Sequence, residues 1–367
     1  MGWGSTTPHP TFMFSAGNIA LRSADRFRSG ALQLTMRSPW LRGIYLDRAR
    51  RLSLLTLGTM ALNLVLAVFF PLWMLAFSPV FWGLPHLVAS LRYSVRPSNS
   101  SRALMALGLL SAILVSLRVW GDFSHVPSWW FYDRRLEFAG LIVAGLILAV
   151  SFRAPISQTL LGLVRLAPLF AAAALYPRLT LGILLFGHHF VAFFMWHNAA
   201  SSARDKKHIQ FLLLCFALAH ALIFIGFFDN LFFLFPSFME LSFADLSLGA
   251  VGQSIFGEAI TAPIIWCRLA VAFAFGQSVH YFIWLRAIPE QHLPNATPTN
   301  FRQSLHWLQR DFGARGAQLA ILFTLAGSAF WLLLEFPMAR IAYISVAAFH
   351  GFLELAALGL GKVKAPA

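Results

Sequence analysis

Histidine recurs inside the hydrophobic stretches of this chain, where an ionisable side chain is unfavourable. An ionisable residue within a membrane span carries a large energetic cost and therefore indicates a functional site. Neutral imidazole is also the commonest metal-ligating side chain. Several such residues on separate helices can converge, which predicts a polyhistidine metal centre in a membrane protein. Five apolar stretches carry these residues: His86, His188 with His189, His220, His280 and His350. His197 lies near the end of the stretch that carries His188 and His189.

The depth of these histidines follows from the rise of about 1.5 Å per helical residue. Counted from the predicted inner end of its stretch, His86 is about nine residues deep. His189, His220 and His350 are each about eleven or twelve residues deep. These four are the expected ligands at one level near mid-membrane. His280 is a further expected ligand, roughly 8 Å nearer the cytosol.

The three histidines of one helix cannot all serve that level. His188 and His189 point about 100° apart, so at most one faces a given neighbour, and we favour His189. His197 follows His189 by about 12 Å along the axis and cannot share its ion unless the helix breaks. His188 and His197 are therefore expected as alternative ligands or as supporting residues.

Two polar residues are expected to orient these imidazoles. A metal-bound imidazole usually donates its second N–H to a carboxylate, an amide or a carbonyl. Glu354 lies one turn beyond His350, and Gln277 lies one turn before His280. Glu354 is the one acidic residue deep in a predicted span, and we assign it the catalytic positioning role.

The spacing also bears on the metal. No two histidines are four residues apart, so the HxxxH and HxxHH boxes of membrane desaturases and hydroxylases are absent. A single ion held by one imidazole from each of several helices fits better. Nitrogen-rich sites suit iron, zinc, copper or nickel. We expect Fe(II), with zinc or copper as alternatives, and a haem is disfavoured because one level dominates.

Composition predicts the class of protein. Of 367 residues, 58% are hydrophobic and 11% are charged, whereas soluble domains carry about 25% charged residues. The expected fold is an all-α bundle that crosses the membrane about ten times. The expected spans are 52–77, 79–95, 103–119, 136–152, 156–176, 179–201, 209–229, 262–286, 316–335 and 338–361.

Charge predicts the orientation of the bundle. With the N-terminus inside, 21 of the 28 Lys and Arg fall in inner segments and five in outer ones. Cytoplasmic loops collect such residues, so both termini are expected in the cytoplasm and the protein in the cell membrane, the inner membrane of a Gram-negative source. The same rule explains the net charge of +14 without a nucleic-acid partner.

The chain is expected to hold one membrane domain with short flanking segments. Residues 1–51 form an arginine-rich cytoplasmic segment, either a solvated tail or an amphipathic helix on the membrane surface. Residues 52–361 form the bundle, and 362–367 form a basic tail. The outer segment 230–261 holds three acidic residues, with Asp229 just before it, and it either caps the bundle or re-enters it. Oligomeric state is left open.

Two sequence elements resemble a known enzyme family. GLPH at 83–86 and FVAFFMWHNAASSARDKKH at 190–208 are similar to elements of the Brp/Blh membrane β-carotene 15,15'-dioxygenases. AAFHGFLELAA at 347–357 resembles a further His-Gly plus acidic element of the family. The resemblance implies a helical membrane enzyme with one histidine-bound non-haem iron, which uses O₂ to cleave a carotenoid to retinal. It carries over His86 and either His189 or His197.

An apolar substrate needs an apolar pocket beside the metal. Such a pocket combines hydrophobic and aromatic walls with a few polar groups that fix orientation. The expected lining residues are the aromatic residues near the histidines, Trp82, Phe193, Trp196 and Tyr281.

Other functions remain open from the sequence. An oxygenase, hydroxylase or desaturase acting on another lipid, a sterol or a quinone would need the same iron site. A histidine-lined transporter is a second alternative, although paired halves are not visible in the sequence. A haem electron-transfer protein, with histidines as axial ligands, is a third.

Overall fold

The fold is known from a computed structural model, which describes positions between 23 and 33 together with 35–95, 101–124, 139–150, 155–232, 240–241, 246–247, 262–293, 301–333, 347, 349–351 and 353–359. These residues are almost entirely helical, as the sequence predicts. The exception is a short antiparallel pair, in which β1 (Glu240–Leu241) pairs with β2 (Leu246–Ser247).

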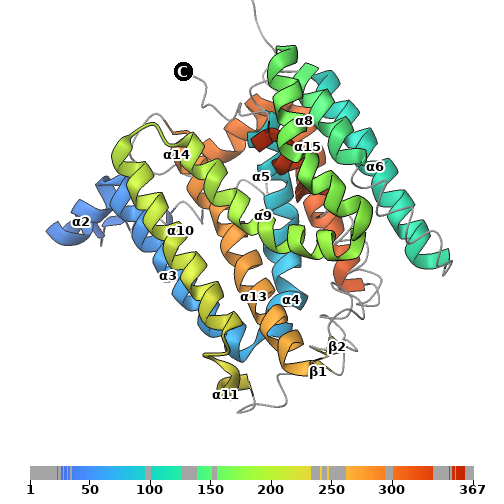
Figure 1. Cartoon of the computed structure of the whole chain (residues 1–367). Helices are drawn as coiled ribbons and strands as arrows, with labels where there is room; N and C mark the ends of the chain where they lie inside the picture. The colour runs from blue at the N-terminus through green and yellow to red at the C-terminus, as the bar shows by residue number, and fades with distance from the viewer. Residues whose placement is uncertain are drawn as a thin grey trace, which may run out of the picture.

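The centre of the bundle is a group of long helices that pack along one another. Helix α13 (Pro263–Phe282) contacts α3 (Arg48–Phe69), α9 (Pro177–Ala199) and α10 (Ala203–Phe224) (Figure 1). α8 (Ile156–Leu175) lies against α9. The buried side of α13 includes Ala270, Ala272 and Ala274. These small residues let the neighbouring helices approach closely, as is common between membrane helices.

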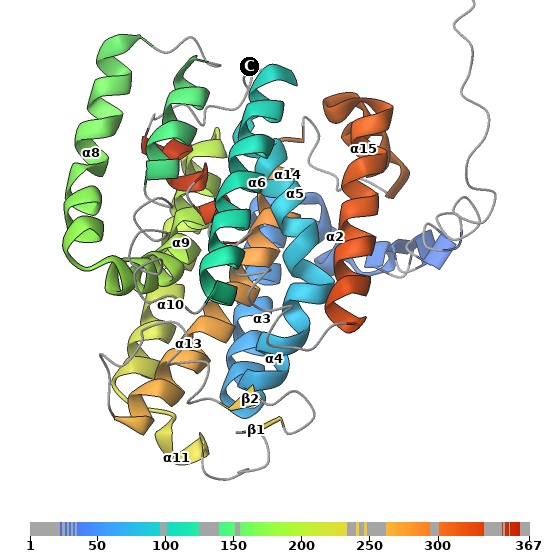
Figure 2. The same ribbon diagram turned by 90° about the vertical axis from the view of Figure 1, so that its right-hand side faces the viewer.

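A second group of helices stands beside this centre. Figure 2 shows α6 (Ser101–Ser124), α5 (Leu84–Val95) and α15 (Phe301–Leu333) next to one another. The described C-terminal helical residues, 349–351 and 353–359, pack into the same core through Phe349 and Leu353.

Three helices are long and apolar enough to cross a membrane among the residues described. They are Arg48–Phe69, Pro71–Tyr93 and Ala203–Phe224. Shorter apolar helices occupy Met105–Leu114, Ala139–Val150 and Thr159–Leu175. Three described helices thus support the prediction of a membrane protein. They are fewer than the roughly ten spans that hydrophobic stretches alone predict.

The first two expected spans divide at a different place from the one predicted. We expected a break between 77 and 79, but α3 ends at Phe69 and Phe70 leaves the helical region with φ −136°. Pro71 then begins α4 (Pro71–Ser78), which continues through the π-helix η1 (Pro79–Gly83) into α5. Proline is favoured in the first turn of a helix, where its missing N–H is not needed.

The helix that carries His280 is longer than predicted. We expected it to end at 286, but α13 continues through the π-helix η6 (Ile283–Ala287) into α14 (Ile288–Gln291). A proline ring clashes with the carbonyl four residues before it. That carbonyl belongs to Phe81 in the case of Pro85 and to Leu285 in the case of Pro289, and each of them lies in a π-helix. The wider π turns therefore let both helices pass a proline without ending.

One further helix begins earlier than hydropathy predicts. α10 begins at Ala203 rather than 209, because the Ser202 side chain accepts a hydrogen bond from the Asp205 backbone N–H and caps the helix. α15 (Phe301–Leu333) joins two helices across Gly313, which is not helical and has φ +75°. The part that follows Gly313 begins close to the expected start at 316, and the part before it is an additional polar helix.

The flanking segments are described in part. α11 (Asp229–Phe232) lies against α3 and α13, and β1 contacts α4, so these pieces of the outer segment cover one end of the bundle (Figure 1). α2 (Pro39–Leu46) packs against α3 and buries none of its residues. Residues 48–51 already belong to α3, whereas 1–22, all of 233–261 except the two strands, and 362–367 lie outside the described residues.

Ion pairs join several helices at the end of the bundle opposite α11. Arg51 of α3 contacts Glu290 of α14 at 2.9 Å, and both side chains are buried. Arg204 of α10 contacts Asp47 at 2.7 Å. Because the Arg51–Glu290 pair is buried, removing either side chain would leave the other charge in a site that water does not reach easily.

Replacing Arg51 with Ala should leave the buried Glu290 carboxylate with Arg286 as its remaining partner, at 2.5 Å. The expected loss of stability exceeds the roughly 1 kcal/mol of an exposed pair and stays below the about 3–5 kcal/mol of an unpaired buried charge, seen as a lower apparent Tm in detergent. Arg50→Ala is the matched control, because the Arg50 side chain is 63% exposed where it meets Asp47, and such pairs contribute less than about 1 kcal/mol. Equal melting temperatures for the two variants would contradict the structural role of Arg51.

Candidate metal centre

Three histidine nitrogens converge at the centre of the molecule. His86 comes from α5, His280 from α13 and His350 from the C-terminal helical residues. The Nε2 atom of His350 lies 3.2 Å from Nε2 of His86 and 3.3 Å from Nε2 of His280. One ligand atom from each of the three lies within 4.8 Å of the others, and all three residues are buried.

A carboxylate completes this group. Oε1 of Glu354 lies 2.7 Å from Nε2 of His350 and 3.7 Å from Nε2 of His280. Glu354 reaches its histidine because residues four apart lie on the same face of a helix. Its side chain is fully buried. The structure therefore places Glu354 among the converging donor atoms, and not only behind them as an orienting group.

The nitrogens and carboxylate oxygens at this centre carry too few protons to hydrogen-bond to one another. Nδ1–H of His86 donates to the Gly83 carbonyl, which leaves Nε2 of His86 with a lone pair directed at the centre. Nε2 of His350 has three close polar neighbours but carries at most one proton. Within the described part of the chain, Nδ1 of His280 and Oε2 of Glu354 have no partner. Lone pairs that face one another in a dry interior favour a cation between them.

The nitrogen separations suit a shared transition-metal ion. Two imidazole nitrogens bound to one ion at about 2.1 Å, with 90–110° between the bonds, lie about 3.0–3.4 Å apart. The two separations at His350, 3.2 and 3.3 Å, fall in that range. The site can thus hold a metal ion through three imidazoles, with the Glu354 carboxylate beside two of them.

The π-helices lie next to two of these ligands. η1 ends three residues before His86, and its last residue, Gly83, supplies the carbonyl that orients the His86 ring. η6 begins three residues after His280. π turns inside α-helices occur frequently at functional sites. Here the Gly83 carbonyl at the end of η1 accepts the hydrogen bond that orients the His86 ring.

The residues that form the centre are not the four that helix depth predicts to lie at one level. His86 and His350 belong to it as expected, and His280 joins them although it was placed nearer the cytosol. The reason is the length of its helix: with the end at Gln291, His280 lies eleven residues deep, like His350. His189 and His220 lie beside the centre, on the far side of Gly276.

The neighbouring histidines of α9 point in different directions, as helical geometry requires. The ring centre of His188 lies 4.7 Å from that of His280 and 6.2 Å from that of His350. His189, which we favoured, faces Gly276, and its ring centre lies 5.7 Å from that of His280. His188 is therefore the α9 residue nearer the converging nitrogens.

Two expected supporting residues lie elsewhere. His197 is near the end of α9, where its Nε2 lies 3.4 Å from the Gln210 amide nitrogen. Nε2 of Gln277 donates to the Ser78 hydroxyl at 2.9 Å, so this amide joins α13 to α4.

Two other residues support the centre that sequence reasoning did not identify. The Ser90 hydroxyl donates to Oε1 of Glu354 at 3.2 Å. The Trp284 ring lies beside His280 and His350, at 6.5 and 6.3 Å between ring centres. Ser90 and Trp284 each follow a ligand by one helical turn, a spacing that was available in the sequence.

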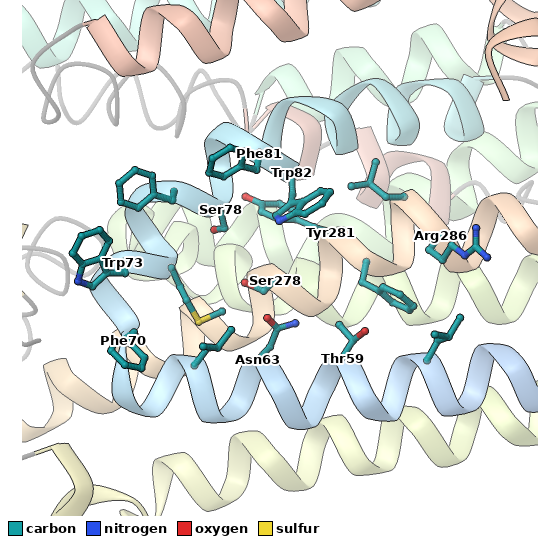
Figure 3. Close-up of a pocket in the computed structure, with 16 residues that line it drawn as sticks. Thr59, Asn63, Phe70, Trp73, Ser78, Phe81, Trp82, Ser278, Tyr281 and Arg286 are labelled. Carbon is teal, nitrogen blue, oxygen red and sulfur yellow. The ribbon is translucent and has the colours of Figure 1, made fainter. Parts of the chain in front are cut away.

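A large apolar pocket lies against one side of the centre. It has a volume of about 930 Å³ and is bounded by α3, α4, η1 and α13 (Figure 3). Trp82 and Tyr281 line it, as expected, and the Tyr281 ring lies 4.3 Å from that of His86. Thr59, Asn63 and Ser278 add a narrow polar strip to the wall.

A second apolar pocket reaches a ligand directly. It has a volume of about 560 Å³ and lies between α5, α6, α15 and the C-terminal helical residues. His350 forms part of its wall, together with Val88 and Phe323. Phe193 and Trp196, the other two expected lining residues, are instead packed in the core near Phe216.

Comparisons with known proteins do not identify this chain: no family model matches it, and no match is found among the curated proteins or the solved structures.

Removing a ligand should remove the metal. His350→Ala should lose bound iron while the protein stays folded, because His350 contacts every other member of the centre. Glu354→Gln should weaken iron binding by about 10–100-fold, the usual effect of changing a polar group at a metal site. The measurement is metal content by plasma mass spectrometry after gel filtration.

His306→Ala is the matched control, because His306 is exposed on α15. It should leave the metal content unchanged. Full iron retention in both His350→Ala and Glu354→Gln would show that these residues do not bind the ion.

Proposed function

We propose that this protein is an integral-membrane, non-haem iron oxygenase that acts on an apolar, membrane-soluble substrate. The observation that carries the proposal is the convergence of three imidazole nitrogens and one carboxylate at the wall of an apolar pocket. Metal ligands alone would suit many functions. Their position beside an apolar pocket of about 560 Å³ favours chemistry on a lipid-like molecule.

Iron fits this donor set well. Sites that combine histidines with one carboxylate and leave positions open are typical of non-haem Fe(II) oxygenases. When bound, a ferrous ion would supply the capacity to bind and activate O₂. Zinc and copper are compatible with the same imidazoles. A haem is a poor fit, because three imidazoles approach one point from different helices and leave no flat gap for a macrocycle.

The chain's own residues would place the substrate and keep water out. Val88 and Phe323 would hold an apolar chain against His350. His86 and His280, buried on all sides, would keep the ligand geometry fixed. The Ser90 hydroxyl would stabilise the Glu354 carboxylate in its ligating position. A pre-organised site of this kind does not have to rearrange during reaction.

The best candidate reaction is oxidative cleavage of a carotenoid to retinal. It is supported by the resemblance of 83–86 and 190–208 to the Brp/Blh family and by the pocket beside His350. The reaction balances without an external reductant: one C=C bond and one O₂ molecule become two carbonyl groups. Hydroxylation or desaturation of another lipid, a sterol or a quinone uses the same site but needs an electron donor.

Membrane placement is part of the proposal. We infer about ten spans with both termini in the cytoplasm of a multi-pass cell-membrane protein. The distribution of positive charge supports this orientation, since Lys and Arg gather in the segments assigned to the inside. The ion pairs of Arg51 and Arg204 lie at this same inner end.

Blocking the pocket beside His350 should stop the reaction without removing the metal. Val88→Trp should lower the turnover of β-carotene by about 100-fold, because a small misplacement of the reacting bond has an effect of that size. Iron content should stay at the wild-type value. The assay is retinal formation and O₂ uptake by the iron-loaded protein in detergent, with an expected ratio of one O₂ for each bond cleaved.

Leu66→Trp, in the larger pocket, is the matched control. Loss of turnover in Leu66→Trp alone would assign the substrate to the larger pocket. A metal-free wild-type protein that conducts protons in liposomes would favour the histidine-lined transporter and overturn the oxygenase.

Reporter fusions test the orientation. A cytoplasm-active fluorescent reporter should work at both the N-terminus and the C-terminus. A phosphatase that is active only outside should be active when inserted after Glu240, in the acidic outer segment. Phosphatase activity at either terminus would contradict the proposed orientation.

A further inference from the structure

The larger pocket contains a serine hydroxyl that has no hydrogen-bond partner. Ser278 of α13 lines this pocket, and its Oγ atom is buried without a partner among the residues that the structure describes. A hydroxyl inside a helix often donates to the carbonyl four residues earlier. Ser53 and Thr56 of the neighbouring α3 do so, at 2.8 and 2.7 Å. The Ser278 hydroxyl is therefore left for a group inside the pocket.

Polar side chains from two other helices line the same pocket. Asn63 and Thr59 come from α3, and Ser78 comes from α4. Figure 3 shows Asn63 and Ser278 entering the pocket from α3 and α13. Ser78 accepts a hydrogen bond from the Gln277 amide at 2.9 Å, so its own proton can be donated into the pocket. Hydroxyls and an amide N–H thus give an otherwise apolar wall several donors.

The two pockets differ in the number of such donors. In the smaller pocket, the described lining has one polar residue besides His350, which is Ser111. The remaining walls are apolar and suit a hydrocarbon. The larger pocket offers three hydroxyls together with the Asn63 amide. Because a buried donor is unfavourable without an acceptor, the larger pocket suits an apolar molecule that carries an oxygen atom.

The larger pocket lies between two helices that can cross a membrane. α3 and the helix Pro71–Tyr93 form two of its walls, and both are long and apolar enough to span a bilayer. Three aromatic side chains of its wall, Trp73, Phe81 and Trp82, are 40%, 60% and 57% exposed. An apolar molecule dissolved in the bilayer can therefore enter this pocket from the side.

Tyr281 separates the larger pocket from the metal centre. Its side chain lines the pocket, while its ring centre lies 4.3 Å from that of His86. A molecule in the pocket is thus close to the centre without touching the converging ligands. The described lining contains one basic residue, Arg286, and no lysine. Since a Schiff base needs an amine such as that of lysine, a carbonyl compound would be held here by hydrogen bonds.

We propose that the larger pocket binds an elongated apolar molecule through a carbonyl oxygen, which accepts hydrogen bonds from Ser278 and Asn63. The proposed oxidation converts one C=C bond into two carbonyl groups. Its product therefore differs from the hydrocarbon substrate in the group that this wall recognises, and the larger pocket is a site for that product. The identity of the molecule as the product rests on the proposed oxygenase, whereas the carbonyl-binding wall does not.

The test is equilibrium binding of all-trans-retinal to the metal-free protein in detergent, followed by quenching of tryptophan fluorescence. The comparison ligand is the hydrocarbon analogue of retinal, in which a methyl group replaces the aldehyde. The wild type should bind retinal about tenfold more tightly than this analogue, the effect expected of one or two net hydrogen bonds.

Ser278→Ala should weaken retinal binding by about three- to tenfold and leave binding of the hydrocarbon analogue unchanged. The apparent Tm should not fall, because the change removes a buried hydroxyl without a partner. Ser278→Ala combined with Asn63→Leu should bind the two ligands equally. Ser111→Ala, in the smaller pocket, is the matched control and should keep the wild-type preference for retinal. Leu66→Trp should bind neither ligand, because it fills the larger pocket.

Two results would overturn the carbonyl site. One is equal wild-type affinity for retinal and its hydrocarbon analogue. The other is an unchanged preference for retinal in the double variant. O₂ uptake by the iron-loaded protein tests the oxygenase separately. Uptake without a preference for retinal would overturn the carbonyl site and leave the oxygenase intact. A preference for retinal that depends on Ser278, without O₂ uptake, would support the carbonyl site and overturn the oxygenase.

Discussion

The constraint on which this structure depends is the burial of lone pairs. Nitrogens of His86, His280 and His350 and a carboxylate oxygen of Glu354 meet in the buried interior, and they have too few protons to satisfy one another. Such groups repel unless a cation lies between them. The helices must therefore hold the ligands firmly enough to withstand that repulsion when the metal is absent.

Two of the ligands lie beside π-helices that carry the chain past a proline. η1 joins α4 to α5, which contains Pro85, and η6 joins α13 to α14, which contains Pro289; each π-helix is three residues from a ligand. The Gly83 carbonyl is thereby available to orient His86. At the end of the bundle opposite α11, the Arg51–Glu290 pair joins α3 to α14, so the segment that follows His280 is fixed to the rest of the bundle.

Pockets on two sides of the centre have different relations to it. The larger pocket is separated from His86 by Tyr281, whereas the smaller one includes His350 in its wall. A substrate in the smaller pocket is next to a ligand, and the larger pocket is suited to a remote part of the substrate or to lipid. Catalysis depends on positioning at the scale of about 1 Å, so this difference bears directly on which pocket serves the reaction.

The sequence by itself determined the helical class, the membrane character and the importance of the buried histidines, because hydropathy and the cost of a buried imidazole are local properties of the chain. It also identified Glu354, one turn from His350. Only the tertiary structure decided which histidines share a centre. His280 joins because its helix extends through a π turn to Gln291, and His189 turns away because α9 directs it over Gly276. Such choices depend on helix ends and rotations, which are set by packing between distant segments.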